Sequence, residues 1–545
     1  MILIIPSAKN VEKDLQKIGN LPAVIYPVNT NIAFDYIYNQ YNHCCQKVKV
    51  LCYENAKKVK SVLSRYKTDK LEICVLPQLD DLGQTISFGL QSVKGPIIIN
   101  FADTFVMENA EKLENDSFYY SEDYLSELWT FFDINKGKIT KIIDKSNQTH
   151  SSTSKEKLFV GVFRLSDSEF FKSCLEEYDS TNINSINSFY KALKKYSEKI
   201  PLKAICTDKW FDIGHEDRYF NSMLEVKARE FNHISIDKNR GILSKKSDDV
   251  EKFIGEIKWY LKLPTEIEYV RPRIFDYSLS YTSPYVTMEY YAYHTLHELF
   301  LYSDLSAAHW EDIFSKIVFV CNDFRKYSIK DNRIINSLEE MYLNKTIQRL
   351  KKLKQSNDAF KNFFEHPIQV NGRRFISIID LIIKLQKIIP EMLYDVNEFT
   401  IIHGDLCFSN IMIDNNFSFI KVIDPRGKFG IFDIYGDHRY ELAKLFHSVD
   451  GKYDFIIKDL FELSFNADNC SINYAIQDKE RGYNLYQIFL RIFKDEIGNN
   501  LKKIELIEAL LFLSMIPLHQ ENIKHQMAML ATGLEILNRV VDITV

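Results

Sequence analysis

Residues 401–414 read IIHGDLCFSNIMID, and the run VIDPRG follows shortly after. Two apolar runs enclose His403, Asp405 and Asn410, and Asp424 ends a further apolar run. Short apolar runs are typical of buried strands. The block therefore predicts strands joined by a loop that carries a carboxylate and an amide, with a second carboxylate close behind. The alternative is a polar turn whose side chains only cap backbone groups.

This set of residues suits phosphoryl transfer from a nucleotide. That reaction needs a carboxylate near the acceptor hydroxyl, oxygen ligands for magnesium and a cation on the phosphates. Asp405 is suited to the first task, and Asn410 and Asp424 offer the oxygen ligands that Mg²⁺ prefers. The stretch thus predicts a site for ATP and Mg.

The pattern H-x-D-x-x-x-x-N followed by I-D resembles the aminoglycoside phosphotransferase and choline kinase group of the kinase-like fold. The glycine before Asp405 and the P-R-G after Asp424 differ from protein kinases, and the A-P-E stretch is missing. The resemblance implies that Asp405 is the catalytic base or orients the hydroxyl. It also implies that His403 braces the loop and that Asn410 and Asp424 bind magnesium.

The same fold implies a lysine on a strand, paired with a glutamate on the next helix. The segment 241–264, GILSKKSDDVEKFIGEIKWYLKLP, offers Lys245 or Lys246, and then Glu256. We prefer Lys245, because a period of two places it on the same face as Leu243. The alternative for either lysine is a solvated surface charge.

Residues 285–291, YVTMEYY, predict the last strand of the smaller lobe and the hinge. By the resemblance, backbone groups near Glu289 and Tyr290 would take the adenine edge, and Met288 would line the adenine pocket. The alternative is an ordinary aromatic-rich strand.

The segment 432–445, FDIYGDHRYELAKL, resembles the stretch that closes the site in bacterial members of the group. Glu441 stands where the resemblance leads us to expect aspartate. Asp437 and Arg439 either contact the acceptor or organise the loop by forming a salt bridge.

The N-terminal half has a different pattern, in which short β-type runs alternate with amphipathic, helix-length stretches. The runs are MILIIP, PAVIYP, KVKVLCY, LEICVLP and PIIINFAD. This alternation predicts a mostly parallel sheet with helices on both faces and ligands beyond the carboxyl ends of the strands. A polar surface loop is expected at 145–157 and a helical connection at 223–231.

Two carboxylates stand out in this half. Asp103 follows the strand PIIIN, and Asp212 lies in the sequence WFDIG. Carboxylates at strand ends can hold the magnesium that activates an α-phosphate. Residues 1–225, including LGQTISFGL around Gly83, resemble the sugar-nucleotide pyrophosphorylase and phosphocholine cytidylyltransferase group. The resemblance implies a nucleotide or NDP-sugar as ligand, with magnesium on Asp103 and Asp212.

The glycine-rich loop of that group is not present. The positions after IIP read SAKNVEK, without the G-x-G-x-R that cradles a triphosphate, and Ala23 stands where the resemblance leads us to expect lysine. Loss of such donors removes much of the electrostatic stabilisation of nucleotidyl transfer. The domain is therefore either a degenerate binding module or one that uses a modified chemistry.

The expected fold class is α/β. It comprises a Rossmann-like, mostly parallel, nucleotidyltransferase-like domain over 1–225, then a bilobal kinase-like α+β domain with a smaller lobe at 232–292 and a mainly helical lobe at 293–545. The net charge of −5 includes no basic block, which argues against nucleic acid. Nine cysteines without a C-x-x-C pair favour a reducing cytoplasm, and no run is long enough for a transmembrane segment.

The leading hypothesis is a small-molecule kinase that phosphorylates a hydroxyl of an amino alcohol such as choline, or of a sugar or polyol. Capsule or surface-glycan biosynthesis is the expected setting. One alternative is a bifunctional kinase and nucleotidyltransferase that makes an NDP-linked precursor. Others are a sugar-nucleotide-binding pseudoenzyme domain that positions the kinase, and a non-catalytic scaffold. The acceptor and the oligomeric state stay open.

Overall fold

A computed structural model describes residues 1–123, 129–143, 155–177, 187–216, 218–223, 233–237, 239–478 and 481–545. The chain divides into two compact units. Unit 1 is Met1–Val226 with Tyr302–Asp304, and unit 2 is Lys227–Leu301 with Leu305–Val545. Most of the expected loop at 145–157 and of the expected helical connection at 223–231 lies outside the described residues.

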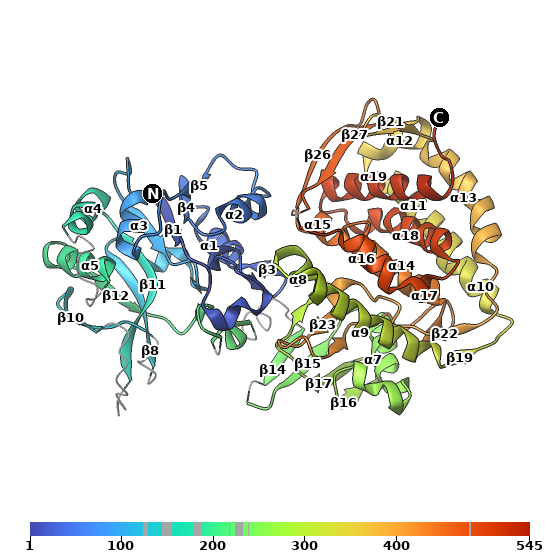
Figure 1. Cartoon of the computed structure of the whole chain (residues 1–545), viewed down its shortest axis with the longest axis horizontal. Coiled ribbons are helices and arrows are strands. Elements are labelled where there is room, and N and C mark those ends of the chain that lie inside the picture. The colour runs from blue at the N-terminus through green and yellow to red at the C-terminus, as the bar shows by residue number, and fades with distance from the viewer. Residues whose placement is uncertain are drawn as a thin grey trace. The chain divides into compact units, whose positions relative to one another are not determined.

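Unit 1 is built on a mixed nine-stranded sheet (Figure 1). Four strands run parallel in the order β6-β1-β4-β5. These are β1 (Ile2–Ser7), β4 (Lys47–Cys52), β5 (Leu71–Val75) and β6 (Ile97–Asn100). In β1 the residues Leu3, Ile4 and Ile5 are all fully buried, as expected for a parallel strand covered on both faces.

The expected mostly parallel sheet is correct for these four strands, and β12 also pairs parallel with β8, but the sheet contains antiparallel pairs as well. β11 (Glu156–Leu165) pairs antiparallel with β6, β8 and β9. The remaining strands are β8 (Ser117–Asp123), β9 (Phe131–Asn135), β10 (Lys138–Ile143) and β12 (Lys203–Cys206). Lys136 and Gly137 between β9 and β10 both have positive φ, the backbone of a tight hairpin. An apolar run does not encode strand direction, so the sequence pattern missed this reversal.

The helices of unit 1 are α1 (Ala33–Tyr41), α2 (Ala56–Leu63), α3 (Leu82–Gly89), α4 (Ser168–Glu176) and α5 (Ser188–Lys199). α3, α4 and α5 contact one another. Gly83 permits this packing, because a Cβ there would lie 2.0 Å from Ser188 Oγ.

The predicted strand PAVIYP is wrong in part. Ala23–Ile25 form a 3-10 helix, and only β2 (Pro27–Val28) is extended, paired with β3 (Asn31–Ile32). A second small pairing joins β7 (Thr104–Val106) to β13 (Trp210–Asp212).

The smaller part of unit 2 is an antiparallel sheet in the order β14-β15-β17-β16. Its strands are β14 (Ile234–Asp237), β15 (Ile242–Lys246), β16 (Ile274–Ser278) and β17 (Tyr285–Glu289). α7 (Val250–Lys262) follows β15, and the Asp249 carboxylate accepts from the Lys252 N–H to cap it. Phe253, Ile254 and Ile257 are buried on its apolar face.

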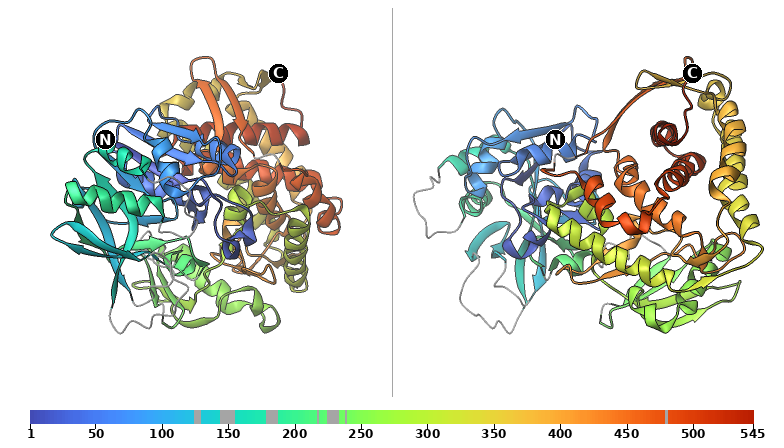
Figure 2. Two further views of the ribbon diagram at one scale, coloured as in Figure 1. Left: turned by 60° about the vertical axis from the view of Figure 1, so that its left-hand side comes forward. Right: turned by 45° about the vertical axis from the view of Figure 1, so that its right-hand side comes forward.

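The rest of unit 2 is mainly helical (Figure 2). Its helices are α8 (Leu296–Tyr302), α9 (Ala307–Arg325), α10 (Ile334–Leu338), α11 (Lys345–Ser356), α12 (Lys361–Glu365), α13 (Ile378–Leu393), α14 (His438–Val449), α15 (Tyr453–Ile457), α16 (Leu485–Ile492), α17 (Lys494–Ile497), α18 (Leu501–Met515) and α19 (Ile523–Val540). α18 and α19 pack side by side, and α11 and α14 both contact α18.

Short strands cross this helical part. β18 (His294–Thr295) joins β23 (Ile411–Ile413) and β24 (Ile420–Val422), while β19 (Ser328–Ile329) and β25 (Tyr435–Gly436) flank β22 (Phe399–Ile401). In the part of the chain that the structure describes, no helix is long and apolar enough to cross a membrane.

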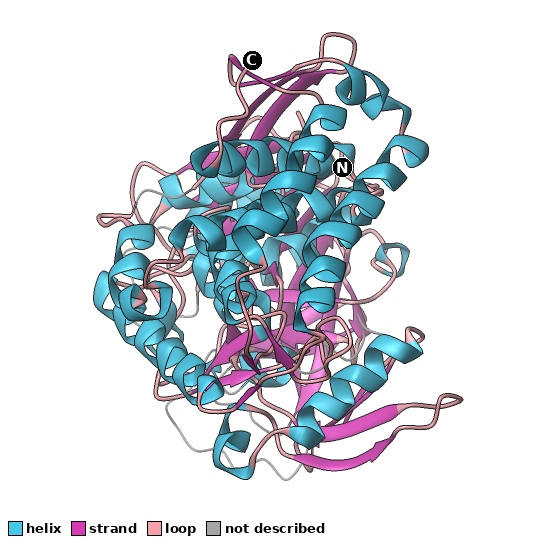
Figure 3. Ribbon diagram, turned by 90° about the vertical axis from the view of Figure 1, so that its right-hand side faces the viewer, coloured by secondary structure: helices cyan, strands magenta, loops and turns pink. Residues whose placement is uncertain are grey.

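A four-stranded sheet in this region was not predicted. It has the order β21-β20-β27-β26 and is formed by β20 (Ile368–Val370), β21 (Arg373–Phe375), β26 (Phe461–Asn466) and β27 (Ser471–Ile476). Figures 1 and 3 show it at the opposite end of unit 2 from the β14–β17 sheet. Its strands come from segments far apart in the chain.

Candidate functional site

The loop 402–410 between β22 and β23 holds Asp405 in one orientation. Asp405 Oδ1 lies 2.8 Å from Lys444 Nζ, and Oδ2 accepts from Asn410 Nδ2 at 3.2 Å. Asn410 Nδ2 also donates to the Asp405 carbonyl oxygen at 2.9 Å. The Asp405 side chain keeps 39% of its surface exposed, so a ligand can reach it.

Asp405 is ionised at neutral pH. Burial opposes its charge, but Lys444 and, to a smaller degree, Arg426 outweigh that effect and lower the pKa of Asp405 to about 2. In return, the Asp405 carboxylate raises the pKa of the buried Lys444 against its desolvation. A carboxylate with so low a pKa is a weak base but a strong hydrogen-bond acceptor.

His403 and Glu441 fix the start of this loop. The backbone N–H groups of His403 and Gly404 donate to the two Glu441 oxygens at 2.7 and 2.9 Å. His403 Nδ1 accepts from the Asp405 N–H at 3.3 Å, so Nε2 carries the hydrogen that reaches the Ile423 carbonyl at 3.0 Å. Burial lowers the pKa of His403 to about 4, which keeps the ring neutral. Glu441, whose side chain is one methylene longer than the expected aspartate, thus accepts from both backbone N–H groups.

The two candidate magnesium ligands of this unit lie at the same end of the β23–β24 hairpin. Ile411 pairs with Val422, and the Ile423 N–H donates to the Asn410 carbonyl oxygen at 3.0 Å. The next residue, Asp424, has a φ of 56°, and its N–H donates to Tyr260 Oη at 3.0 Å. An amide oxygen and a carboxylate at one place are a donor set that fits Mg²⁺.

Lys245 on β15 pairs with Glu256 on α7 and also contacts Asp424. Its Nζ is 2.9 and 3.0 Å from the two Glu256 oxygens and 2.8 Å from Asp424 Oδ1. Although burial opposes its charge, Asp424 and Glu256 raise the pKa of Lys245. Burial and the Asp424 charge raise the pKa of Glu256 to about 7. Lys246 is exposed on the opposite face of β15.

Met288, Glu289 and Tyr290 lie at the end of β17. The Met288 side chain is buried. The Glu289 N–H donates to the Arg273 carbonyl oxygen and the Tyr290 N–H to the Gly241 carbonyl oxygen, each at 2.8 Å. These two N–H groups are therefore used within the protein, and an adenine would have to bind other backbone groups of this segment.

Asp437 and Arg439 pair with each other. Asp437 caps α14 through the Arg439 N–H at 2.9 Å, and its carboxylate lies 2.8 Å from Arg439 Nη2. Arg439 Nη1 also reaches Asp395 at 2.8 Å. Both residues are buried, so they organise the start of α14. Lys444, which the sequence analysis did not select, lies one turn after Glu441 on that helix. This spacing of a carboxylate and a cation was the signal that could have identified it.

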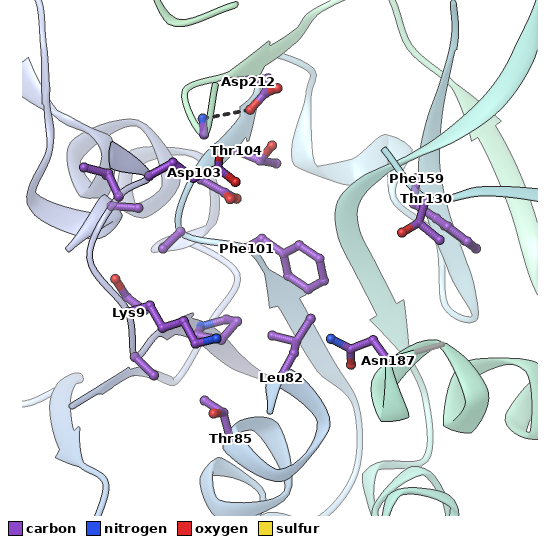
Figure 4. A pocket seen from close by; sticks show the side chains of 18 of the residues that line it. Lys9, Leu82, Thr85, Phe101, Asp103, Thr104, Thr130, Phe159, Asn187 and Asp212 are labelled. Carbon is purple, nitrogen blue, oxygen red and sulfur yellow. Dashed lines mark hydrogen bonds between the residues drawn. The ribbon is translucent and has the colours of Figure 1, made fainter. Parts of the chain in front are cut away.

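Unit 1 contains a cavity of about 540 Å³ at the carboxyl end of its parallel strands. Asp103 and Asp212 both line it, as Figure 4 shows. The β7–β13 pairing brings them together, because Asp212 pairs with Thr104. A Cβ on Gly214 would lie 3.1 Å from Asp103 Oδ2 and 3.2 Å from Asp212 Oδ1. Only glycine therefore leaves the space between these carboxylates open.

Asp212 is held by three donors. The Gly214 N–H donates to Oδ1 at 2.8 Å and Trp129 Nε1 donates to Oδ2 at 3.1 Å. His215 Nδ1 lies 2.9 Å from Oδ2. These contacts orient the carboxylate, and its oxygens are a chemically suitable donor set for a divalent cation.

Two backbone N–H groups of the loop after β1 already have acceptors within the protein and cannot serve as a phosphate cradle. The Asn10 N–H donates to Glu54 Oε2 at 2.7 Å, and the Val11 N–H donates to the Leu21 carbonyl oxygen at 2.8 Å. Lys9, in contrast, lines the cavity (Figure 4) and has no ion-pair partner among the described residues. The missing glycines are evident in the sequence, whereas Lys9 was not predicted as a site residue.

Comparisons with known proteins found no matching family model and no matching curated protein. Among solved structures, a putative glucose-1-phosphate thymidylyltransferase from Bacillus anthracis is 14% identical, with a TM-score of 0.35, 43% of this chain covered and 97% of that chain. CTP:phosphocholine cytidylyltransferase from Streptococcus pneumoniae is 12% identical, with a TM-score of 0.35, and the match covers 41% of this chain and 99% of that chain. The inositol-1-phosphate CTP transferase from T. maritima is 16% identical, with a TM-score of 0.33, and the match covers 42% of this chain and 96% of that chain. These matches lie in the N-terminal part of the chain.

Proposed function

We propose that unit 2 transfers the γ-phosphoryl group of ATP to a hydroxyl of a small molecule. The observation that carries this proposal is the pairing of Lys245 with both Glu256 and Asp424, at 2.8 to 3.0 Å. Lys245 and Asp424 are 179 positions apart, yet they meet where the fold also brings Asn410. A lysine, its glutamate and two magnesium ligands form the phosphate-binding half of such a site.

Asp405 supplies the other half. The acceptor oxygen forms a bond to the γ-phosphorus, the bond from that phosphorus to the bridging oxygen breaks, and ADP leaves. The hydroxyl proton passes to Asp405 and then to water. Because its pKa is about 2, Asp405 mainly orients the hydroxyl and takes the proton late, as the new bond forms.

Magnesium, when bound, neutralises charge on the phosphates. Asn410 and Asp424 are the residues that would hold it. Lys245 would then contact the phosphates in place of Asp424, and Glu256 would remain its ion-pair partner. His403 and Glu441 take no proton in this scheme; they keep the Asp405 backbone in position.

The test is a kinase screen of the full chain with Mg·ATP across amino alcohols, sugars and polyols, with products identified by mass spectrometry. Asp405→Asn should lower kcat at least about 100-fold, since general base and positioning roles contribute about 10² to 10⁴. Lys245→Met should weaken ATP binding, whereas Lys246→Met, the matched control on the opposite face of β15, should not. Equal ATP binding by the two lysine variants would contradict the assignment.

We further propose that unit 1 binds a nucleotide or an NDP-sugar. A single cavity is lined by two potential metal ligands, Asp103 and Asp212, and by Lys9, a cation without an ion-pair partner among the described residues, and this supports the proposal. The bonded N–H groups of Asn10 and Val11 favour binding over nucleotidyl transfer. Scanning calorimetry of the full chain with CTP or UTP tests binding, and pyrophosphate release would favour the bifunctional alternative in surface-glycan precursor synthesis.

A further inference from the structure

Four basic side chains lie near one another and near Asp405. They come from three elements, namely α11, α14 and the loop after β24, and they are Lys345, Arg349, Arg426 and Lys444. Lys444 forms an ion pair with Asp405, with Nζ 2.8 Å from Oδ1. Among the described residues no other carboxylate forms an ion pair with any of the four, so Lys345, Arg349 and Arg426 have no anionic partner in that part of the chain.

Arg426 is fixed directly beside the catalytic loop. Its N–H donates to the His403 carbonyl oxygen at 3.0 Å. A Cβ on Gly404 would lie 3.0 Å from Arg426 Cβ. Nη1 of the guanidinium donates to Tyr440 Oη at 2.9 Å, which leaves other N–H groups of the fork for a ligand.

Lys345 and Arg349 are one turn apart on α11 and therefore lie on one face of the helix. Arg349 Nη1 donates to the Ser514 carbonyl oxygen at 3.2 Å. The Lys345 side chain has no hydrogen bond or ion pair among the described residues, although its backbone N–H donates to the Glu340 carbonyl oxygen. Lys345 follows directly on a π-helical turn, Glu339–Asn344, and such irregular turns are frequent at functional sites.

Such an arrangement is unfavourable by itself. Like charges four residues apart destabilise a helix, and partial burial adds to the cost. Burial, followed by the charges of Arg426, Arg349 and Lys444, lowers the pKa of Lys345 to about 5, and Asp405 opposes this only in part. Without a ligand Lys345 is therefore mostly uncharged at neutral pH, and a bound anion would favour its charged form. A bound anion would remove the repulsion and form charge-assisted hydrogen bonds with these groups.

We propose that the phosphate acceptor is itself an anion. It is a hydroxyl compound that carries a phosphate or carboxylate group, with this group bound by Lys345, Arg349 and Arg426 and its hydroxyl facing Asp405. The inference rests on the proposed phosphotransferase function of unit 2. It disfavours choline and other cationic amino alcohols, because their charge would be repelled here.

The first experiment measures binding and does not require turnover. Glycerol 3-phosphate, D-glycerate and inorganic phosphate are titrated into the full chain with Mg·ADP present, with glycerol and choline as neutral and cationic counterparts. At least one anion should bind, and Lys345→Met and Arg349→Met should each weaken it about 10- to 100-fold, the effect of one hydrogen bond to a charged group. Lys351→Met, an exposed lysine on the same helix, is the matched control and should change nothing.

The second experiment compares kcat/KM for phosphorylation of the same compounds. An anionic acceptor should be preferred, and the two variants should raise its KM while the KM for ATP stays constant. Preference for glycerol or choline, or anion binding that is absent or equal in wild type and both variants, would overturn the inference. Phosphorylation of a neutral compound that depends on Asp405 would leave the phosphotransferase standing and reject only the anionic acceptor. Anion binding by these residues without any transfer would keep the anion site, but it would reject the phosphotransferase and with it the role of the anion as phosphate acceptor.

Discussion

At the scale of single residues, two neighbouring side chains of a strand have different environments because they lie on opposite faces of the sheet. Lys245 and Lys246 are adjacent, yet β15 sends one toward Glu256 and the other to solvent. The period of two in a strand made this difference predictable once Leu243 was assigned to the buried face. The partner Asp424, in contrast, comes from another part of the chain and was not predicted to pair with Lys245.

His403 should make unit 2 sensitive to acid. Its pKa falls from 6.5 to about 4 on folding, so the unfolded chain binds the proton more tightly. The stability that it contributes is present above pH 6.5 and is lost as pH falls toward 4. Between pH 8 and pH 5 we expect the free energy of unfolding to drop by about 2 kcal/mol through this residue alone.

Urea unfolding of unit 2 at both pH values, in wild type and His403→Asn, measures this effect. Comparing the two proteins cancels the contributions of other buried groups to the pH dependence. One such group is His447, because burial also lowers its pKa. The variant should lose less stability on acidification. An identical pH dependence in both proteins would show that His403 does not carry it.

At the scale of elements, the segment after Asp424 packs directly on α7. Gly427 has a φ of 68°, and a Cβ there would lie 2.1 Å from the Gly255 carbonyl carbon. This contact holds the segment after Asp424 against the helix that carries Glu256. The sequence P-R-G distinguished the chain from protein kinases but did not indicate what the glycine touches.

Gly427→Ala should therefore destabilise unit 2 strongly. Gly372→Ala is the matched control, because its φ of 84° imposes similar backbone strain while no atom lies within 4 Å of its Cβ. Strain alone costs about 1 to 2 kcal/mol, and overpacking adds roughly 1 to 3 kcal/mol. In chemical denaturation, Gly427→Ala should therefore lose more unfolding free energy than Gly372→Ala. Equal losses in the two variants would mean that the contact with α7 does not contribute to stability.

At the scale of the whole molecule, each unit has its own core and its own candidate site. Unit 1 surrounds Asp103 and Asp212, and unit 2 surrounds Asp405 and Lys245. A ligand that binds only the folded form of one unit raises the unfolding temperature of that unit. We expect CTP or UTP to raise one calorimetric transition of the full chain and Mg·ATP to raise the other.

Lys245→Met supplies the control for this prediction, because it should abolish the shift with Mg·ATP and preserve the shift with CTP or UTP. A single transition that responds equally to every nucleotide would contradict independent sites.

The sequence by itself determined what depends on local pattern and side-chain chemistry. The strands β1, β4, β5 and β6 followed from apolar runs, α7 from its amphipathic period, and Asp405, Asn410 and Asp424 from residue types that suit phosphoryl transfer. Only the tertiary structure decided features that depend on long-range pairing. These are the reversed direction of β11, the β20–β27 sheet and the contact between Lys245 and Asp424. They also include the cations around Asp405, because no local pattern encodes which distant segments share a site.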